Sequence, residues 1–133
     1  MILITGKEGF LAGKLASAMQ GDIRFTSLDD NDEWRLDLTA PERFDYSRIG
    51  EKDLLFHCAG ISSPDECEKN YETVKKINVE GTLYFLEKCL GRGGRVLFFS
   101  SDTVYGAGDD VFNENSYCNP LGFYATMKHT VEK

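Results

Sequence analysis

Three side chains near the end of the chain have the types and spacing needed to move a proton while a hydride is transferred. Tyr124 and Lys128 are four residues apart in "YATMK", so a helix would project them from the same face. A free tyrosine has a pKa of about 10, and an ammonium beside it favours the phenolate. Ser101 follows a predicted strand, where its hydroxyl could hold a reacting alcohol or carbonyl. Taken alone, Y-x-x-x-K is also typical of an ordinary pair on a helix surface.

A second group of residues, at the start of the chain, has the spacing of a phosphate-binding turn. In "LITGKEGFLAGKLA", an apolar strand runs directly into a turn that carries Gly6 and Gly9. Gly6 permits a sharp turn, Gly9 permits close approach of a pyrophosphate, and Ala12 permits close packing of helix on strand. The N–H groups and the positive end of the following helix would then face the phosphates.

A carboxylate follows the second predicted strand at the distance expected for a dinucleotide site. Asp29 lies where a carboxylate would accept hydrogen bonds from the adenosine ribose, and it would repel a 2′-phosphate. This position favours NAD, with NADP less favoured. The alternative is that Asp29 and Asp30 are solvated residues of a turn.

The elements that must position these side chains alternate between short β-rich runs and helical patterns, which is typical of parallel βαβ units. We therefore expect a three-layer αβα doubly wound parallel sheet of the Rossmann type. A loop is expected from Asp102 to Cys118. Strands are expected at 1–5, 23–28, 34–38, 53–60 and 95–101, and helices at 9–19, 40–49, 63–90 and from 119 to the chain end.

Composition narrows the classes of function. The chain has 133 residues and a net charge of −7, which suits one domain and disfavours nucleic acid or an anionic membrane as partner. No leader or membrane-spanning run is seen, so a soluble cytoplasmic protein is expected. The cysteines lack C-x-x-C spacing, and His57 and His129 are far apart, so no metal site is predicted.

Six short motifs occur along the chain in an order that resembles one enzyme group. They are "TGKEGFLAG", "DL" at 37–38, "HCAG" at 57–60, "INVEGTLYFLEKC", "FFSSDTVYGA" and "NPLGFYATMKHTVE". Together they resemble the extended short-chain dehydrogenase/reductases, especially the NAD-dependent sugar-nucleotide epimerase/dehydratase family. Each motif is weak alone, but the set covers essentially the whole chain.

The resemblance implies NAD as cofactor and a nucleotide-linked sugar as substrate, with hydride transfer at a sugar hydroxyl or ketone. It implies that Ser101, Tyr124 and Lys128 form a catalytic triad, in which Tyr124 is the acid/base and Lys128 binds the nicotinamide ribose. The Asn78 position helps to order the site. From the residues and the resemblance together, the expected cofactor-binding residues are Gly6, Gly9, Phe10, Leu11, Asp29, Asp37, Leu38, Cys58, Ala59, Gly60, Asn78, Tyr124 and Lys128.

Departures from the family pattern narrow the expected reaction. Ala12 stands where a third glycine is usual, and Met127 replaces the usual small residue before the lysine. In the 4,6-dehydratase branch an Asp-Glu pair follows the triad residue, whereas here Asp102 is followed by Thr103. "SSD" also resembles the sugar-nucleotide 4-keto reductases. An epimerase or reductase is therefore expected, although a steroid or phenylpropanoid-type ketone stays open as substrate.

Family members run to more than twice this length. We therefore expect residues 1–133 to be the NAD-binding Rossmann domain of a longer enzyme, truncated after the helix that carries Tyr124 and Lys128. The substrate-binding C-terminal lobe would be absent, with at most weak catalysis by this chain. The alternative is a non-catalytic dinucleotide-binding or regulatory module with an idle triad. The resemblance also implies a homodimer through the helices around residues 66–90 and 120–133.

Overall fold

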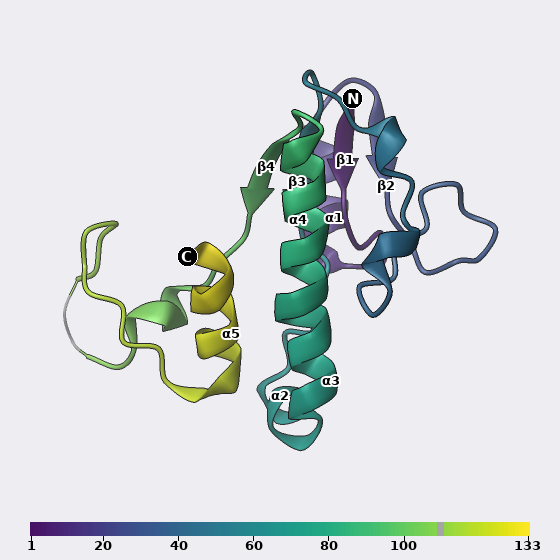
Figure 1. Cartoon of the computed structure of the whole chain (residues 1–133). Coiled ribbons are helices and arrows are strands. Elements are labelled where there is room, and N and C mark those ends of the chain that lie inside the picture. Colours follow the sequence, from purple (N-terminus) through teal and green to yellow (C-terminus); the bar gives the residue numbers. More distant parts are fainter. Residues whose placement is uncertain (109–110) are drawn as a thin grey trace.

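The computed structural model describes residues 1–108 and 111–133, which form a parallel sheet with helices on both faces (Figure 1). The four strands are β1 (Ile2–Ile4), β2 (Ile23–Phe25), β3 (Leu54–His57) and β4 (Arg95–Phe98), in the order β2-β1-β3-β4. All three pairings are parallel. The predicted doubly wound fold is confirmed, and the strand order reverses between β1 and β3, which is where ligands bind in such sheets.

Successive residues of the two central strands, β1 and β3, point to opposite faces of the sheet, and both faces are covered by helices. Leu3 and Leu55 are paired in register and lie in the same core cluster as Phe85 of α4 (Thr82–Gly91). Ile4 pairs with Phe56, and both pack with fully buried Ala12 of α1 (Phe10–Ala18) on the opposite face. Figure 1 shows α4 in front of the sheet and α1, fainter, behind it. The period-two alternation therefore produces the three layers.

The helix expected over 63–90 is present but is interrupted twice. Ser63 caps its start by accepting a hydrogen bond from the Glu66 N–H, and α2 (Pro64–Lys69) ends at Asn70, whose φ of −123° and ψ of 41° are not helical. After α3 (Tyr71–Lys75), the backbone widens into a π-helical segment, η3 (Lys76–Gly81), before α4 begins. Such wide turns are common at functional sites.

The segment between β2 and β3 is not built as expected. Residues 34–38 form no strand, since their single ladder contact is a bridge between Ser27 and Arg35. The helix expected at 40–49 is replaced by two short 3-10 turns, η1 (Pro41–Arg43) and η2 (Tyr46–Arg48). The segment is instead fixed by the buried side chains of Trp34, Leu36, Leu38 and Phe44, of which the first three produced the strand pattern in the sequence.

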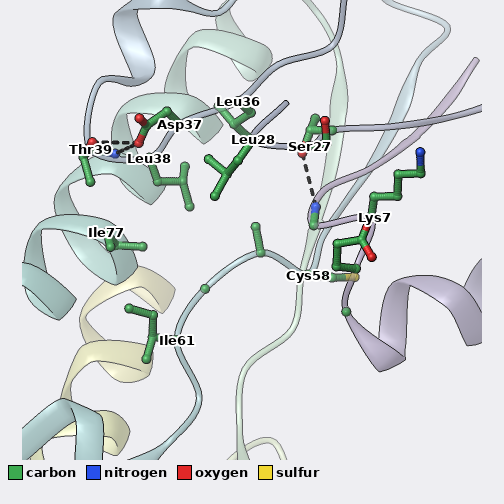
Figure 2. Close-up of a pocket in the computed structure, with 16 residues that line it drawn as sticks. Lys7, Ser27, Leu28, Leu36, Asp37, Leu38, Thr39, Cys58, Ile61 and Ile77 are labelled. Atoms are coloured by element: carbon green, nitrogen blue, oxygen red, sulfur yellow. Dashed lines mark hydrogen bonds between the residues drawn. The ribbon is translucent and has the colours of Figure 1, made fainter. Parts of the chain in front are cut away.

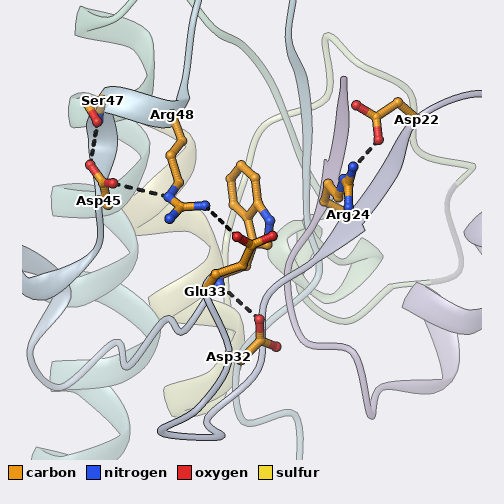
Figure 3. Close-up of polar contacts among 8 residues, drawn as sticks. Asp22, Arg24, Asp32, Glu33, Asp45, Ser47 and Arg48 are labelled. Carbon is orange, nitrogen blue, oxygen red and sulfur yellow. Dashed lines mark hydrogen bonds and ion pairs between the residues drawn. The ribbon is translucent and has the colours of Figure 1, made fainter.

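Polar contacts close this segment on its outer side. Arg48 lies 3.1 Å from Glu33 Oε2 and 3.1 Å from Asp45 Oδ2, and its guanidinium also lies over the Trp34 ring (Figure 3). Asp45 in turn accepts a hydrogen bond from the Ser47 N–H. Aspartates that bond to the backbone two residues on are typical of tight turns, which explains the absence of a regular helix.

The last part of the chain carries the tyrosine and lysine singled out above. Ser101 caps a 3-10 turn, η4 (Asp102–Tyr105), and α5 runs over Gly122–Glu132, starting three residues later than expected. Met127 of α5 packs with Cys67, Val74 and Val79 of the interrupted helix. The loop expected from 102 to 118 thus contains η4, and its positions 109–110 lie outside the described residues. None of the described helices has the length and apolar character that crossing a membrane requires.

Candidate functional site

Two adjoining cavities open at the carboxyl ends of β1 and β3. They measure about 550 Å³ and about 350 Å³, and their walls share Gly9, Cys58, Ala59, Gly60 and Ile61. The larger cavity, here the first cavity, reaches toward the segment after β2. The smaller one, the second cavity, reaches toward α5. Their common wall lies at the reversal of strand order, the usual ligand position in this architecture.

The turn after β1 is held tightly against the turn after β3. Gly6 has a φ of +79°, and a Cβ on it would lie 3.1 Å from the Ala59 Cα, so only glycine fits without strain. Its N–H donates to Thr26 Oγ1 at 3.2 Å. Gly9 donates to the Gly6 carbonyl at 2.8 Å and begins α1. The predicted sharp glycine turn is therefore present, and it lines the first cavity.

The N-terminus of α1 points its free N–H groups toward the shared wall. Gly9 is the N-cap, and in the described part of the chain no side chain caps this end. The first turn runs Phe10, Leu11, Ala12, all three of which line the second cavity. Uncapped N–H groups and the positive helix end attract an anion, and Lys7 lines the neighbouring first cavity. This end of α1 is therefore a locally favourable position for an anion on a chain of net charge −7.

A buried chain of hydrogen bonds fixes the turn after β3. Thr5 Oγ1 accepts hydrogen bonds from the N–H groups of Cys58 at 3.0 Å and Ala59 at 2.9 Å. His57 Nδ1 lies 3.2 Å from Thr5 Oγ1, and His57 Nε2 lies 3.2 Å from Thr82 Oγ1. Because the Thr82 hydroxyl donates to the Ile77 carbonyl, it accepts from His57 Nε2–H, which leaves Nδ1 to accept from Thr5.

His57 is therefore a neutral structural residue of this turn. Its side chain is almost fully buried, and burial, together with the positive charge of Lys128, lowers the pKa of His57 to about 3. A neutral imidazole satisfies both hydroxyl partners at once, one as donor and one as acceptor. The network ties β1, β3 and α4 together directly beneath the shared wall of the cavities.

The far end of the first cavity is apolar. Leu28, Leu36 and Leu38 face Ile61 and Ile77 across it (Figure 2). Asp37 and Thr39 lie at the rim on this side in the figure, and Lys7 lies at the opposite end.

The rim carboxylate is locked in place. Asp37 Oδ1 accepts hydrogen bonds from the Thr39 N–H at 2.8 Å and the Thr39 hydroxyl at 2.7 Å. These bonds, aided by Arg35 and Arg43 and opposed by partial burial, lower the pKa of Asp37. The arrangement offers a flat apolar slot with a fixed negative charge at its edge, which suits a nitrogenous base.

Asn78 and Gly81 of the π-helical segment each hold a residue that lines a cavity, Ile61 and Leu38 respectively. Asn78 Oδ1 accepts from the Ile61 N–H at 2.8 Å, and its Nδ2 donates to the Ile61 carbonyl at 2.7 Å. Both backbone groups of Ile61 are thus satisfied by one amide. A Cβ on Gly81 would meet the Leu38 carbonyl oxygen at 1.9 Å, so the backbone of residues 36–39 packs directly on the helix.

Tyr124 and Lys128 both line the second cavity from α5. Lys128 Nζ donates to the Phe99 carbonyl at 2.7 Å and lies 5.8 Å from the centroid of the Tyr124 ring. Burial lowers the pKa of Lys128, although the neighbouring Cys58 opposes this. Burial, together with Cys67, raises the pKa of Tyr124, which opposes the phenolate form that the ammonium is expected to favour. The lysine is held by the backbone after β4, and its ammonium also lies over the Tyr124 ring.

Two expected site residues lie outside the described walls of both cavities. Asp29 accepts a hydrogen bond from the Asn31 N–H at 2.9 Å in an exposed turn, although Leu28 beside it lines the first cavity. Ser101 caps η4 and lies 2.8 Å from Thr103 Oγ1, whereas its neighbour Ser100 lines the second cavity with Tyr124. The other expected cofactor-binding residues all line one cavity or both.

Sequence reasoning missed several residues of the walls. Ile61 and Ile77 adjoin positions that were identified, since one follows "HCAG" and the other precedes Asn78. Their apolar side chains could have identified them as wall residues, because a binding slot for a nitrogenous base needs apolar walls. Lys7 lies inside the glycine turn, and its charge was likewise readable. Nothing in the sequence distinguished Ser100 from Ser101.

The chain matches one family over residues 1–133, the family described as the RmlD substrate binding domain. Among curated proteins it is similar to the ADP-L-glycero-D-manno-heptose-6-epimerase of Brachyspira hyodysenteriae, at 25% identity over 158 residues, which is 100% of this chain and 47% of that protein. It is also similar to methionine adenosyltransferase 2 subunit beta of Bos taurus, at 26% identity over 80 residues, which is 60% of this chain and 24% of that protein.

Three solved structures share the fold over 98% of the chain. A hypothetical dTDP-4-dehydrorhamnose reductase from Sulfolobus tokodaii has a TM-score of 0.81 at 24% identity, with 50% of that chain covered. MoeE5 in complex with UDP-glucose and NAD has a TM-score of 0.79 at 23% identity, with 46% covered. RMD from Pseudomonas aeruginosa complexed with NADPH has a TM-score of 0.72 at 25% identity, with 47% covered. The chain thus spans half or less of the length of each of these proteins.

Proposed function

Because the chain belongs to the family of the RmlD substrate binding domain, we propose that its two adjoining cavities form a single binding site for NAD. The observation that carries the proposal is their common wall, where the Gly6–Gly9 turn, the N-terminus of α1 and the turn after β3 meet at the reversal of strand order. A dinucleotide is two nucleotides joined by a pyrophosphate, so it suits two cavities that adjoin at a position favourable for an anion.

The chemistry of each wall assigns the parts of the cofactor. The adenine would lie in the apolar slot of the first cavity, between Leu36 and Leu38 on one side and Ile61 on the other, with Asp37 at its edge. The pyrophosphate would lie over Gly9. The nicotinamide and its ribose would lie in the second cavity, where Lys128 would bind the ribose hydroxyls.

We propose NAD as the preferred cofactor, with NADP bound less well. Asp29 lies one residue beyond the first cavity wall at Leu28, where its negative charge would repel a 2′-phosphate. Similar folds are solved with either cofactor, MoeE5 with NAD and RMD with NADPH. If Asp29 reads the ribose, it must exchange its Asn31 contact for the ribose hydroxyls.

The proposed reaction is hydride transfer at a hydroxyl or ketone of a nucleotide-linked sugar, as part of an epimerase or reductase. NAD supplies the hydride acceptor and its reduced form the donor. Tyr124 takes the hydroxyl proton on oxidation and returns it on reduction, and Ser101 holds the reacting oxygen. Since burial keeps the pKa of Tyr124 raised, the positive nicotinamide of bound NAD is what would favour its phenolate. Residues 1–133 would supply the cofactor-binding portion of this activity.

A titration of the chain with NADH and NADPH, followed by nicotinamide fluorescence, tests the proposal. Saturable NADH binding is expected, with weaker NADPH binding, and Asp29→Ala should weaken NADH and narrow the difference between the two cofactors. Asp30→Ala is the matched control, because Asp30 is exposed and pairs with Arg35. No binding of either cofactor by folded chain would contradict the proposal, and an unchanged preference in Asp29→Ala would remove Asp29 from the ribose site.

A second candidate function is a non-catalytic dinucleotide-binding module. Two observations favour it: Ser101 is engaged in capping η4, and the Bos taurus relative is by name a subunit of methionine adenosyltransferase. The two functions differ in turnover. Oxidation of NADH by a nucleotide-linked 4-ketosugar, lost in Tyr124→Phe, would favour the enzyme, whereas NADH binding that Tyr124→Phe leaves unchanged, with no turnover, would favour the module.

We propose pairing of two copies through the outer surface of the helices at 66–90 and 120–133. The inner surfaces of these helices already pack on each other through Met127, Cys67 and Val74. Tyr84, Leu90 and Phe123 stay exposed on them. Sedimentation of wild type beside Phe123→Glu tests this: a dimer that the variant dissociates supports it, and a monomeric wild type contradicts it.

A further inference from the structure

A cysteine, a histidine and a glutamate meet at the C-terminal helix, away from the walls of both cavities. Their ligand atoms, Cys118 Sγ, a His129 ring nitrogen and a Glu132 carboxylate oxygen, all lie within 4.8 Å of one another. His129 Nδ1 is 3.1 Å from Glu132 Oε2. Cys118 and His129 are partly buried, and the Glu132 side chain keeps 30% of its surface exposed. From the sequence no metal site is predicted, since the cysteines lack C-x-x-C spacing and Cys118 lies eleven positions before the histidine.

The backbone brings the three residues together in a defined way. His129 and Glu132 are three residues apart on α5, so they lie on the same face of the helix. Cys118 precedes α5, in a stretch anchored at Asn119. A Cβ on Gly106 would meet the Asn119 carbonyl oxygen at 2.4 Å, so the two ends of the loop after η4 are in direct backbone contact there. The backbone contact between Gly106 and Asn119 thus holds the Cys118 thiol beside α5.

We infer that Cys118, His129 and Glu132 form a site for a divalent transition metal of the zinc class. Thiolate, imidazole and carboxylate are the ligands that Zn²⁺ takes, at about 2.0 to 2.3 Å, which places tetrahedral ligands roughly 3.3 to 3.8 Å apart. The ligand atoms already lie within about an ångström of that spacing, so rotations of the three side chains suffice. Three protein ligands leave a fourth position for water or another ligand.

Such a metal would fasten the stretch before α5 to the helix that carries Tyr124 and Lys128. Ser100 lies beside Glu132, and Lys128 donates a hydrogen bond to the Phe99 carbonyl, so the site adjoins the backbone that follows β4. Binding would therefore order η4 and its surroundings without entering either cavity. The inference does not depend on the proposed cofactor site.

The test is a titration of the full chain with Co²⁺ and Zn²⁺ under reducing conditions. Co²⁺ should bind one to one, with intense visible bands of a tetrahedral site and a thiolate-to-cobalt charge-transfer band in the near ultraviolet, and Zn²⁺ should displace it. Cys118→Ser should remove the charge-transfer band. Both Cys118→Ser and His129→Gln should weaken metal binding by at least ~100-fold, since even outer partners of metal ligands are worth about 10- to 100-fold.

Cys58→Ser is the matched control, because Cys58 is a second partly buried thiol that lies in the cavity walls and outside the cluster. It should keep the full metal affinity and spectrum. Circular dichroism of each variant checks folding. The inference is overturned if wild type binds no stoichiometric metal, if the cobalt spectrum lacks the thiolate band, or if folded Cys118→Ser binds as tightly as wild type. If the variants do not fold, the wild-type cobalt spectrum still decides.

Discussion

Asn78 holds Ile61, a residue of the wall that the two cavities share, through the oxygen and the nitrogen of its side-chain amide. Asn78→Asp keeps the oxygen that accepts from the Ile61 N–H but places a negative charge 2.7 Å from the Ile61 carbonyl in place of a donor. We expect the free energy of unfolding to fall by about 1 to 3 kcal/mol, the cost of a partly buried polar group left without its partner. NADH binding should weaken as well, because Ile61 lines both cavities.

Urea denaturation and the NADH titration measure the two effects. The matched control is Asn115→Asp, at an exposed asparagine in the loop before α5, for which a change within about 0.5 kcal/mol is expected. Equal stability of Asn78→Asp and wild type would show that the amide is not needed to hold Ile61.

His57 predicts a pH dependence of stability with a definite sign. The folded chain keeps His57 neutral down to a pKa of about 3, whereas the unfolded chain protonates it near 6.5. Between these values the unfolded state binds more protons, so the stability from neutral His57 is fully present above pH 6.5 and is lost as pH falls. The slope approaches about 1.4 kcal/mol per pH unit.

Denaturant unfolding at pH 6.5, 5.5 and 4.5, compared with His57→Gln, isolates this contribution. The stability difference between wild type and variant should shrink as pH falls through this range. Aspartates with lowered pKa, such as Asp32 and Asp37, contribute mainly at lower pH and are common to both chains. A difference that is independent of pH would show that His57 is not buried in its neutral form.

At the residue scale, the sequence indicated which residues could form a site. It did not show which of their side chains already form hydrogen bonds with neighbouring residues. Gly6, Gly9 and Gly60 could be identified from the sequence, because their roles depend on the absence of a side chain and the residue type alone shows that absence. Asp29 and Ser101 were chosen by spacing, yet each is engaged by its own turn, by Asn31 in one case and Thr103 in the other. Competition between a ligand and a neighbouring backbone group depends on loop geometry, which spacing alone does not specify.

At the scale of elements, the π-helical segment and the chain after β2 depend on each other. Gly81→Ala would place a methyl group 1.9 Å from the Leu38 carbonyl oxygen, which forces the backbone of residues 36–39 away from the helix. We expect a loss of several kcal/mol, above the range of about 1 to 3 kcal/mol typical of overpacking by side chains, because a backbone must shift. The apolar slot of the first cavity should open, and NADH affinity should fall.

Thermal unfolding of Gly81→Ala and of its control, Gly13→Ala, measures this effect. Gly13 also lies within a helix, but a Cβ there meets nothing within 4 Å. Alanine is favoured over glycine inside helices, so Gly13→Ala should gain about 0.5 to 1 kcal/mol. The contact between Gly81 and Leu38 would be refuted if the two variants changed stability alike.

Elements with strong periodicity were predictable, and those shaped by contacts across the chain were not. The strands β1, β3 and β4 and the helix α1 agree with their apolar patterns to within a few residues. Residues 34–38 show an alternating pattern that a strand would have, but their buried side chains pack on α4 without joining the sheet. The π-helical segment ends at Gly81, which packs against Leu38, a contact that no local pattern encodes.

At the scale of the whole molecule, the resemblance to sugar-nucleotide short-chain dehydrogenase/reductases is confirmed by the family match and by the curated relative that is an epimerase. The parallel sheet, with its order β2-β1-β3-β4, places the turn with Gly6 and Gly9, the Asn78 side chain and the helix α5 around one pair of cavities. Residues more than a hundred positions apart in the sequence thus line the same cavity. The central claim of the account is that the two cavities together bind a dinucleotide.

Nuclear magnetic resonance of the isotope-labelled chain titrated with NAD tests that claim most directly. We predict that the backbone amide signals of Gly6, Gly9, Ala59, Gly60 and Asn78 shift together and saturate with one dissociation constant, while those of Gly21 and Gly91, which line neither cavity, stay in place. Shifts confined to other surfaces, or no shifts in a folded chain at saturating NAD, would contradict the account.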